Sequence, residues 1–164
     1  HMVRLNKTML LLAKIENDRF PDKVKVDISD MLVKAVELND EIYSYKEISS
    51  SLSREGNFIH EMNEQMASVL VTNLVKNAYV HSPEGSGISV TVSGDGFSIS
   101  NPGDMPLDQD KLYHRFYQPE GRKEGSTGLG LALAYSVCER NGLALSYDFK
   151  ENRHIFRVIL KNSR

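Results

Sequence analysis

Two asparagines, Asn73 and Asn77, lie four residues apart in the stretch NLVKNAYVHS. Apolar residues recur at helical spacing from residue 63 to residue 81, so both amides fall on one face of a predicted helix. An amide oxygen is a suitable ligand for Mg²⁺, which prefers oxygen and usually bridges to substrate phosphates. Buried amides also cap helices or bond to a neighbouring helix. The pair by itself leaves both interpretations open.

A second stretch that could bind a ligand is GSTGLGLALA, residues 125–134. Gly125, Gly128 and Gly130 stand directly before an alanine-rich segment that is typical of a helix. Glycine lets another group approach the main chain closely, and a helix N-terminus offers unpaired N–H groups with partial positive charge. The stretch therefore suits a phosphate-binding turn, and it also suits a plain linker.

The composition bounds the class of protein. The chain has 164 residues, 40% of them hydrophobic, and a formal net charge of -2, which fits one domain and favours no nucleic-acid partner. The single cysteine, Cys138, excludes a disulfide framework and fits a reducing compartment. No apolar run approaches the roughly 20 residues that span a bilayer, and no signal peptide is apparent. His1 and Met2 resemble the remnant of an expression tag, so we expect the natural protein to extend upstream.

The pattern along the chain alternates between helices and strands. Helical spacing occurs in residues 3–17, 29–45 (with Ser29 or Asp30 as a possible cap), 63–81, 108–118 and 129–142 (closed by Gly142). Alternating or apolar strand patterns occur in residues 23–29, 46–53, 57–62, 87–93, 97–101, 143–149 and 153–160. The short turns between the paired strands predict antiparallel hairpins. We expect an α+β fold, a two-layer α/β sandwich with one mixed, mostly antiparallel sheet and helices on one face.

Four stretches in a fixed order carry a resemblance to a known family. NLVKNAYVHS, ISNPG, HRFYQP and GSTGLGLALA resemble the N, G1, F and G2 boxes of the sensor histidine kinase catalytic domain, a member of the GHKL superfamily with gyrase, Hsp90 and MutL ATPases. The resemblance runs from about residue 24 to the end and implies the Bergerat ATP-binding fold. LLLAKIEN resembles the end of the second helix of the dimerisation and phosphoacceptor domain. The implied division is residues 1–20 for that helix and 21–164 for the ATP-binding catalytic domain.

The resemblance implies roles for three catalytic residues. Asn77 matches the position that coordinates Mg²⁺, Asn73 matches the asparagine close to the metal and phosphates, and Arg115 would supply positive charge to the terminal phosphate. Related ATPases have a glutamate at the position of Asn73, where it activates water. An amide is a poor general base, so the residue favours transfer to a nucleophile supplied elsewhere over rapid hydrolysis.

The resemblance also implies a set of nucleotide-binding positions. They are Asn73, Asn77, His81, Asn101, Gly103, Phe116, Thr127, Gly128, Leu129 and Gly130. Asn101 stands where the family has an adenine-binding aspartate; its amide oxygen still accepts a hydrogen bond but without charge assistance. Met105 replaces a glycine of the G1 box, and Val80 replaces a lysine that reaches the phosphates. His81 has two open interpretations, a ligand contact or a cap on the last carbonyls of its helix. Residues 118–127 would form the lid.

The implied function is ATP-dependent phosphorylation of a histidine by a two-component sensor kinase, with ATP and Mg²⁺ as cofactors. None of the five histidines is followed by Glu-Leu-Arg, so we expect the phosphoacceptor domain upstream and expect this chain to bind ATP without phosphorylating itself. The implied partners are that domain and, through phosphohistidine, a response regulator receiver domain. We expect the full-length protein to be a homodimer anchored in the bacterial inner membrane, with this domain cytoplasmic. The alternatives are a degenerate GHKL module that acts through protein contacts and, third, a GHKL ATPase.

Overall fold

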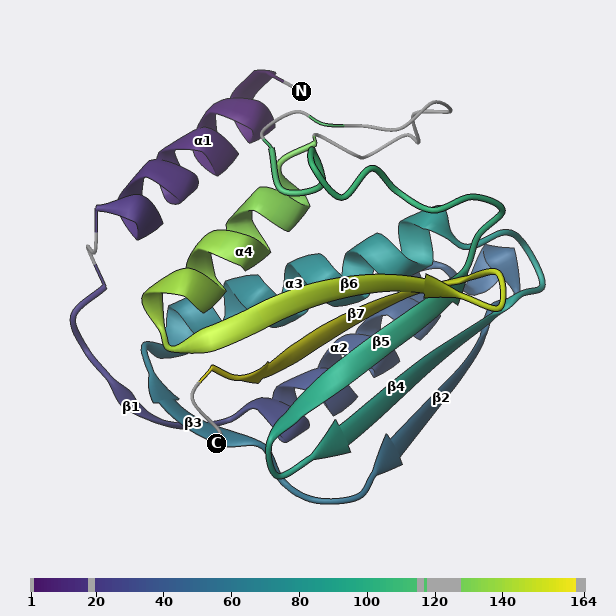
Figure 1. Ribbon diagram of the computed structural model, residues 1–164, viewed down its shortest axis with the longest axis horizontal. Helices are drawn as coiled ribbons and strands as arrows, with labels where there is room; N and C mark the ends of the chain where they lie inside the picture. Colours follow the sequence, from purple (N-terminus) through teal and green to yellow (C-terminus); the bar gives the residue numbers. More distant parts are fainter. Residues whose placement is uncertain (1, 18–19, 115–116, 118–127, 162–164) are drawn as a thin grey trace.

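A layer of helices packs against one face of a five-stranded sheet in the computed structural model (Figure 1), which describes residues 2–17, 20–114, 117 and 128–161. The strand order is β2-β4-β5-β7-β6. The strands are β2 (Ser49–Arg54), β4 (Gly87–Ser93), β5 (Gly96–Pro102), β6 (Leu143–Lys150) and β7 (Arg153–Leu160). β2 runs parallel to β4, and the other neighbours are antiparallel. The predicted fold class, a two-layer sandwich with a mixed, mostly antiparallel sheet, is confirmed.

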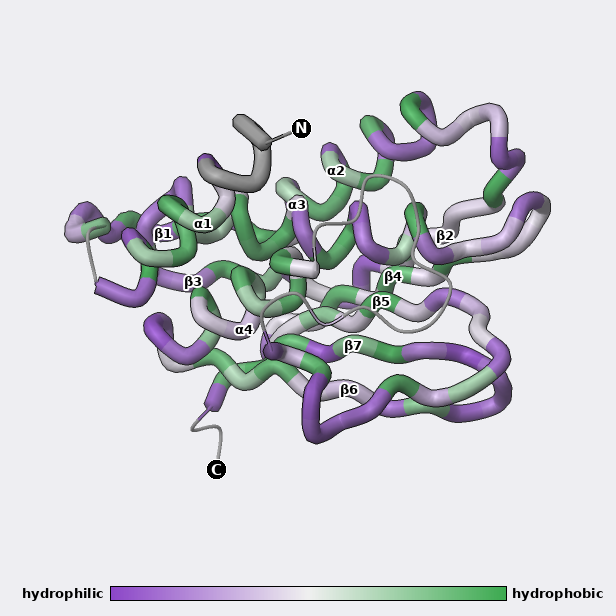
Figure 2. Tube along the Cα trace, turned by 90° about the horizontal axis from the view of Figure 1, so that it is seen from above, coloured by the Kyte–Doolittle hydropathy of each residue, from purple (hydrophilic) through white to green (hydrophobic). Residues whose placement is uncertain are grey.

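The helices that cover the sheet are α2 (Ile28–Ile42), α3 (Glu64–His81) and α4 (Gly130–Arg140), and α1 (Met2–Glu16) lies against α4. Leu12 and Ile15 of α1 are buried there, as their helical spacing predicted, and the Arg140 guanidinium donates to the Glu16 carbonyl. Apolar residues gather where the helices meet the sheet, and polar residues follow the outer turns (Figure 2). α3 lies between α2 and α4, which explains why its buried residues surround more than one face.

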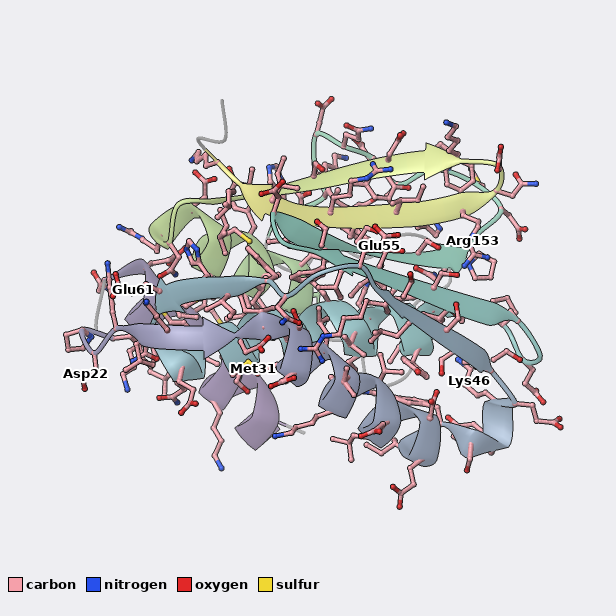
Figure 3. The ribbon with its side chains drawn as sticks, turned by 90° about the horizontal axis from the view of Figure 1, so that it is seen from below. Asp22, Met31, Lys46, Glu55, Glu61 and Arg153 are labelled. Carbon is pink, nitrogen blue, oxygen red and sulfur yellow. The ribbon has the colours of Figure 1, made fainter. Side chains whose placement is uncertain are left out.

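The prediction of a single sheet is wrong in one respect. β1 (Val24–Asp27) and β3 (Ile59–Met62) pair with each other in a separate antiparallel ribbon, with Val26 opposite His60. Figure 3 shows the ribbon, with Glu61 and the nearby Asp22, at the opposite end of the molecule from Lys46 and Arg153. The alternating pattern of a short strand does not specify its partner, so sequence reasoning could not separate the two sheets.

The start of α2 also differs from the prediction. The strand ends at Asp27, and the Asp27 carboxylate, not Ser29 or Asp30, caps the helix by accepting from the Asp30 N–H at 3.2 Å. Ser29 is fully buried instead, and its hydroxyl accepts from the Phe58 N–H at 2.6 Å. The helix therefore begins one residue before the predicted 29–45, because an aspartate at the end of a strand is as good a cap as the serine that follows it.

The helix predicted over residues 108–118 is absent from its described part. Residues 109–113 are hydrogen-bonded turns, in which the Lys111 N–H donates to the Asp108 carbonyl at 3.1 Å and the His114 N–H to the Lys111 carbonyl at 2.9 Å. These are three-residue spacings, so the segment forms short turns where a helix would require four. Residues 115, 116 and 118 of the prediction lie outside the described residues.

A polar network fixes α3 against α2 and the sheet. The Tyr79 hydroxyl donates to Asp40 at 2.6 Å, and the Ser50 hydroxyl donates to the other Asp40 oxygen at 2.7 Å. Tyr79 is fully buried, and burial together with the Asp40 carboxylate raises the pKa of its hydroxyl above the ordinary value of 10.0. Asp40 thus joins α2, α3 and β2, and holds the helix that carries Asn77 in a fixed place.

Candidate functional site

Asn73 meets the beginning of α4. Its Nδ2 donates to the Val69 carbonyl one turn earlier at 2.8 Å. Its Oδ1 faces Gly130, where a Cβ atom would lie only 3.2 Å away. Two stretches that the sequence places far apart, the N box and the G2 box, therefore lie in contact. Gly130 fits this approach because any side chain there would push against the Asn73 amide.

Asn77 lies one turn further along α3. Its side chain is half-buried, and within the part of the chain that the structure describes no hydrogen bond engages its amide. Its helix is fixed by the Asp40 network at the neighbouring Tyr79. A half-buried amide held on a rigid helix, with its oxygen still open to a ligand, is the arrangement that a metal-binding or phosphate-binding asparagine requires.

The turn into α4 needs glycine at one position. Gly128 has φ +77°, in the left-handed region that other residues rarely adopt. Leu129 is fully buried and occupies the N-cap, its apolar side chain makes no capping hydrogen bond, and the first turn contains no acidic residue. The positive end of the helix is therefore not neutralised by a side chain of its own first turn, which suits an anion.

The C-terminal end of α3 is capped by residues that the sequence analysis did not single out. Lys46 Nζ donates to the Tyr79 and Val80 carbonyls at 2.8 and 3.1 Å, and the Ser82 hydroxyl donates to the Ala78 carbonyl at 2.6 Å. Lys46 (labelled in Figure 3) comes from η1 (Ser44–Lys46), and its charge favours the negative end of the helix. His81, the last residue of α3, is half-buried. Three of the helix-end carbonyls that the capping interpretation of His81 would use already accept from other groups.

Asn101 continues the inner row of β5. Phe97, Ile99 and Asn101 point toward the helices, and Asn101 is only 2% exposed. Its Nδ2 donates to the Pro102 carbonyl at 3.3 Å. Buried amides are normally hydrogen-bonded, and Asn101 is the residue for which the family resemblance implies the adenine contact.

Gly103 follows β5 and lies against His154 of β7. A Cβ atom on Gly103 would overlap the His154 imidazole, and the Gly103 N–H donates to the Asn152 carbonyl at 2.9 Å. The glycine of the G1 box is therefore required by packing inside the protein, quite apart from any ligand. No sequence signal singled out His154, because its position opposite Asn101 depends on the β5–β7 register.

We expect His154 to make the free energy of unfolding depend on pH. Burial lowers the pKa of its imidazole below the ordinary 6.5, so near that pH the folded chain binds fewer protons than the unfolded chain. Stability from the neutral imidazole is fully present above about pH 6.5 and is lost as the pH falls below it. We expect the free energy of unfolding in urea to fall more between pH 7.5 and pH 5.5 for the wild type than for His154→Gln. The exposed His114→Gln serves as control, and equal losses in all three proteins would refute the assignment.

Three predicted site residues, Arg115, Phe116 and Thr127, lie outside the described residues, as does the whole of the predicted lid at 118–127. A hollow of about 500 Å³ lies elsewhere, between α1 and α4, with Leu12, Tyr113 and Tyr135 in its lining. None of the predicted site residues that the structure describes lines it. Among the described residues no group of three or more His, Cys, Asp or Glu side chains could hold a metal ion.

The family follows from the match of residues 62–163, more than half of the chain, to the model described as "Histidine kinase-, DNA gyrase B-, and HSP90-like ATPase". The chain belongs to this family. The predicted resemblance is confirmed, and with it the prediction of an ATP-binding catalytic domain of a two-component sensor kinase.

Sensor kinases are prominent among the similar proteins. "Sensor protein QseC" of Escherichia coli (strain K12) is 27% identical over 148 residues, which cover 88% of this chain and 33% of QseC. The cytoplasmic segment of histidine kinase QseC superposes with a TM-score of 0.72 at 18% identity, covering 94% of this chain and 87% of that one. Full-length ShkA in complex with AMPPNP superposes with a TM-score of 0.77 at 21% identity, covering 98% of this chain and 36% of that one. The chain thus spans about a third of the length of the curated relatives it matches.

In the described part of the chain, no helix has the length and apolar character needed to cross a membrane.

Proposed function

We propose that this chain binds ATP with Mg²⁺ and supplies the γ-phosphoryl group to a histidine on a separate phosphoacceptor domain. The observation that carries the proposal is the contact between Asn73 and Gly130, which joins the amide face of α3 to the glycine-flanked start of α4. The family membership, and the complex of the similar ShkA with AMPPNP, support nucleotide binding by this chain.

The donor set of α3 fits a magnesium ion bound through phosphate. Asn77 offers one amide oxygen on a rigid helix, and Mg²⁺ usually takes one or two protein oxygens and completes its shell with water and phosphate. When bound, Mg²⁺ would neutralise charge on the phosphates. Asn73 would orient the phosphates beside it, and as an amide it would leave attacking water without a general base. Arg115 would add a cationic fork at the terminal phosphate.

The start of α4 would hold the other phosphate oxygens. Gly128 supplies the left-handed turn, and the N–H groups from Thr127 to Gly130 would face the ligand at the positive end of the helix. Asn101 and Gly103 would form the adenine end, Phe116 would seat the lid, and His81 would lie near the nucleotide.

The remaining proposals concern the whole protein. Residues 1–20 would end the second helix of a dimerisation and phosphoacceptor domain, and residues 21–164 would be the catalytic domain. α1 already contacts α4, so the two parts pack together. The full-length protein would be a homodimer anchored in the bacterial inner membrane, with this domain in the cytoplasm, and a response regulator receiver domain would take the phosphoryl group from the histidine.

The test is calorimetric titration of this chain with AMPPNP, with and without Mg²⁺, together with phosphate release from ATP. We expect Mg²⁺-dependent binding and slow release, because no carboxylate occupies the position of Asn73. An absence of binding at millimolar nucleotide would instead assign the chain to the degenerate GHKL modules that act by contact. Rapid phosphate release without an acceptor would assign it to the ATPases.

A further inference from the structure

Two side chains of the last hairpin hold both ends of the segment 103–107. The Leu107 N–H donates to the Tyr147 hydroxyl at 2.9 Å, at the end of the segment. The same hydroxyl lies 2.7 Å from His154 Nδ1. The His154 ring packs against the backbone of Gly103, at the start of the segment. A single hydrogen-bonded pair from β6 and β7 therefore contacts the segment at its first and last residues.

The direction of these hydrogen bonds follows from the chemistry of the groups. The Tyr147 oxygen accepts from a backbone N–H, so its own proton is available for His154 Nδ1. Nδ1 can accept only in the neutral imidazole, and the burial of His154 favours that neutral form. The two hydrogen bonds are therefore compatible: the Leu107 N–H donates to the Tyr147 oxygen, and the Tyr147 hydroxyl donates to His154 Nδ1.

Packing against neighbouring aromatic rings fixes the side chains of Tyr147 and His154. Tyr147 is 9% exposed, and its ring lies 5.0 Å from the ring of Phe156. The His154 ring lies 5.1 Å from that of Phe149. By contrast, Asp104, Met105 and Pro106, in the middle of the segment, are exposed and bury no side chain in the core. The position of the segment therefore depends on its two ends.

The segment begins directly beside the proposed adenine end of the site. Gly103 comes two residues after Asn101, and Asn101 lies opposite His154 in the β5–β7 register. We propose that Tyr147 and His154 are positioning residues, which fix the segment 103–107 and through it the surface that receives the adenine. This proposal rests on the proposed function, because it assigns a support to the nucleotide site described above.

The test compares Tyr147→Phe, which keeps the ring and removes the hydroxyl, with Tyr45→Phe, which removes a hydroxyl from an exposed tyrosine. Two quantities are measured: amide hydrogen exchange at Leu107 without ligand, and the dissociation constant for AMPPNP with and without Mg²⁺. We expect Tyr147→Phe to accelerate Leu107 exchange and to weaken AMPPNP binding about tenfold. The ratio of the two dissociation constants should stay at its wild-type value, because the phosphate end is untouched. Tyr45→Phe should change neither quantity.

His154→Asn is a second variant, which removes the imidazole but keeps a hydrogen-bond acceptor for the Tyr147 hydroxyl. Its amide oxygen can take the place of Nδ1 as acceptor, so Leu107 exchange should stay closer to the wild type than in Tyr147→Phe. Wild-type Leu107 exchange and wild-type affinity in Tyr147→Phe would overturn the inference while leaving the proposed function intact. If the wild-type chain bound no nucleotide, both the inference and the proposed function would be overturned, and this result would be known before any variant is made. A change in the Mg²⁺ ratio would also contradict it, because it would indicate general damage to the site.

Discussion

Asn77→Ala is expected to weaken Mg²⁺-dependent binding of AMPPNP by about 100-fold, the upper end of the range for removing a group that supports a metal ligand, because Asn77 would hold the ion directly. The physical reason is specific to this amide. It lies half-buried on α3, and its removal breaks no hydrogen bond with any residue that the structure describes. What is lost is the oxygen that the ion would use. The affinity without Mg²⁺ should change little, so the titration of the variant should give similar constants in the two conditions.

The folding of the variant separates this effect from simple damage. Alanine is the best helix former, so Asn77→Ala should leave the melting temperature of the chain unchanged or slightly higher. Ser68→Ala, at an exposed position of the same helix, is the matched control and should keep wild-type binding in both conditions. If Asn77→Ala retained the full Mg²⁺ dependence, the ion would have to be held elsewhere, and the assignment of α3 as the metal-binding element would fall.

Gly96→Ala is expected to lower the free energy of unfolding by about 3 kcal/mol, the upper part of the range for overpacked sites. Gly96 is buried at the start of β5, opposite Ile159 of β7. A Cβ atom there would overlap the Val158 carbonyl oxygen and lie 3.0 Å from the Ile159 Cα. Both obstacles are backbone atoms of a paired strand, so no rotation of a side chain can relieve the clash. β5 and β7 must separate, and their hydrogen bonds weaken.

The same turn provides the control for this prediction. Gly94 lies two residues earlier, its φ is not positive, and nothing lies within 4 Å of the place its Cβ would occupy. Gly94→Ala should therefore leave stability within about 0.5 kcal/mol of the wild type. Urea denaturation of the three proteins measures the difference. Equal stabilities for the Gly94 and Gly96 variants would mean that the strands can shift without cost, contrary to the tight contact between β5 and β7.

The elements were predictable where a local signal was strong. α3 was predicted because its apolar residues keep helical spacing over many turns, and Leu70, Leu74 and Ala78 are buried as expected. The hairpins β4–β5 and β6–β7 were predicted from short turns between alternating segments. The helix predicted over 108–118 is absent from its described part, because its periodicity is short and its acidic, polar start also suits a series of turns.

Within the candidate site, only the residues that belong to the sequence motifs could be predicted. The resemblance identified Asn73 and Gly130, and the structure brings them into contact. It could not identify Tyr147, His154 or Lys46, because each acts through a partner that only the tertiary fold supplies. A tyrosine and a histidine in a terminal hairpin have no special pattern, and their importance appears when the β5–β7 register sets His154 opposite Asn101.

The strand order of the sheet has a consequence for the order of folding. The β4–β5 and β6–β7 pairs join neighbours in the sequence, so they can form early and at little entropic cost. The β5–β7 pair joins residues 96–102 to 153–159, and it must close a long intervening loop that includes α4. Asn101, Gly103 and His154 meet only at this junction. We therefore expect the chain to gain its proposed adenine-binding surface at a late step, after both hairpins exist, and a nascent chain to lack this surface until β7 has emerged from the ribosome.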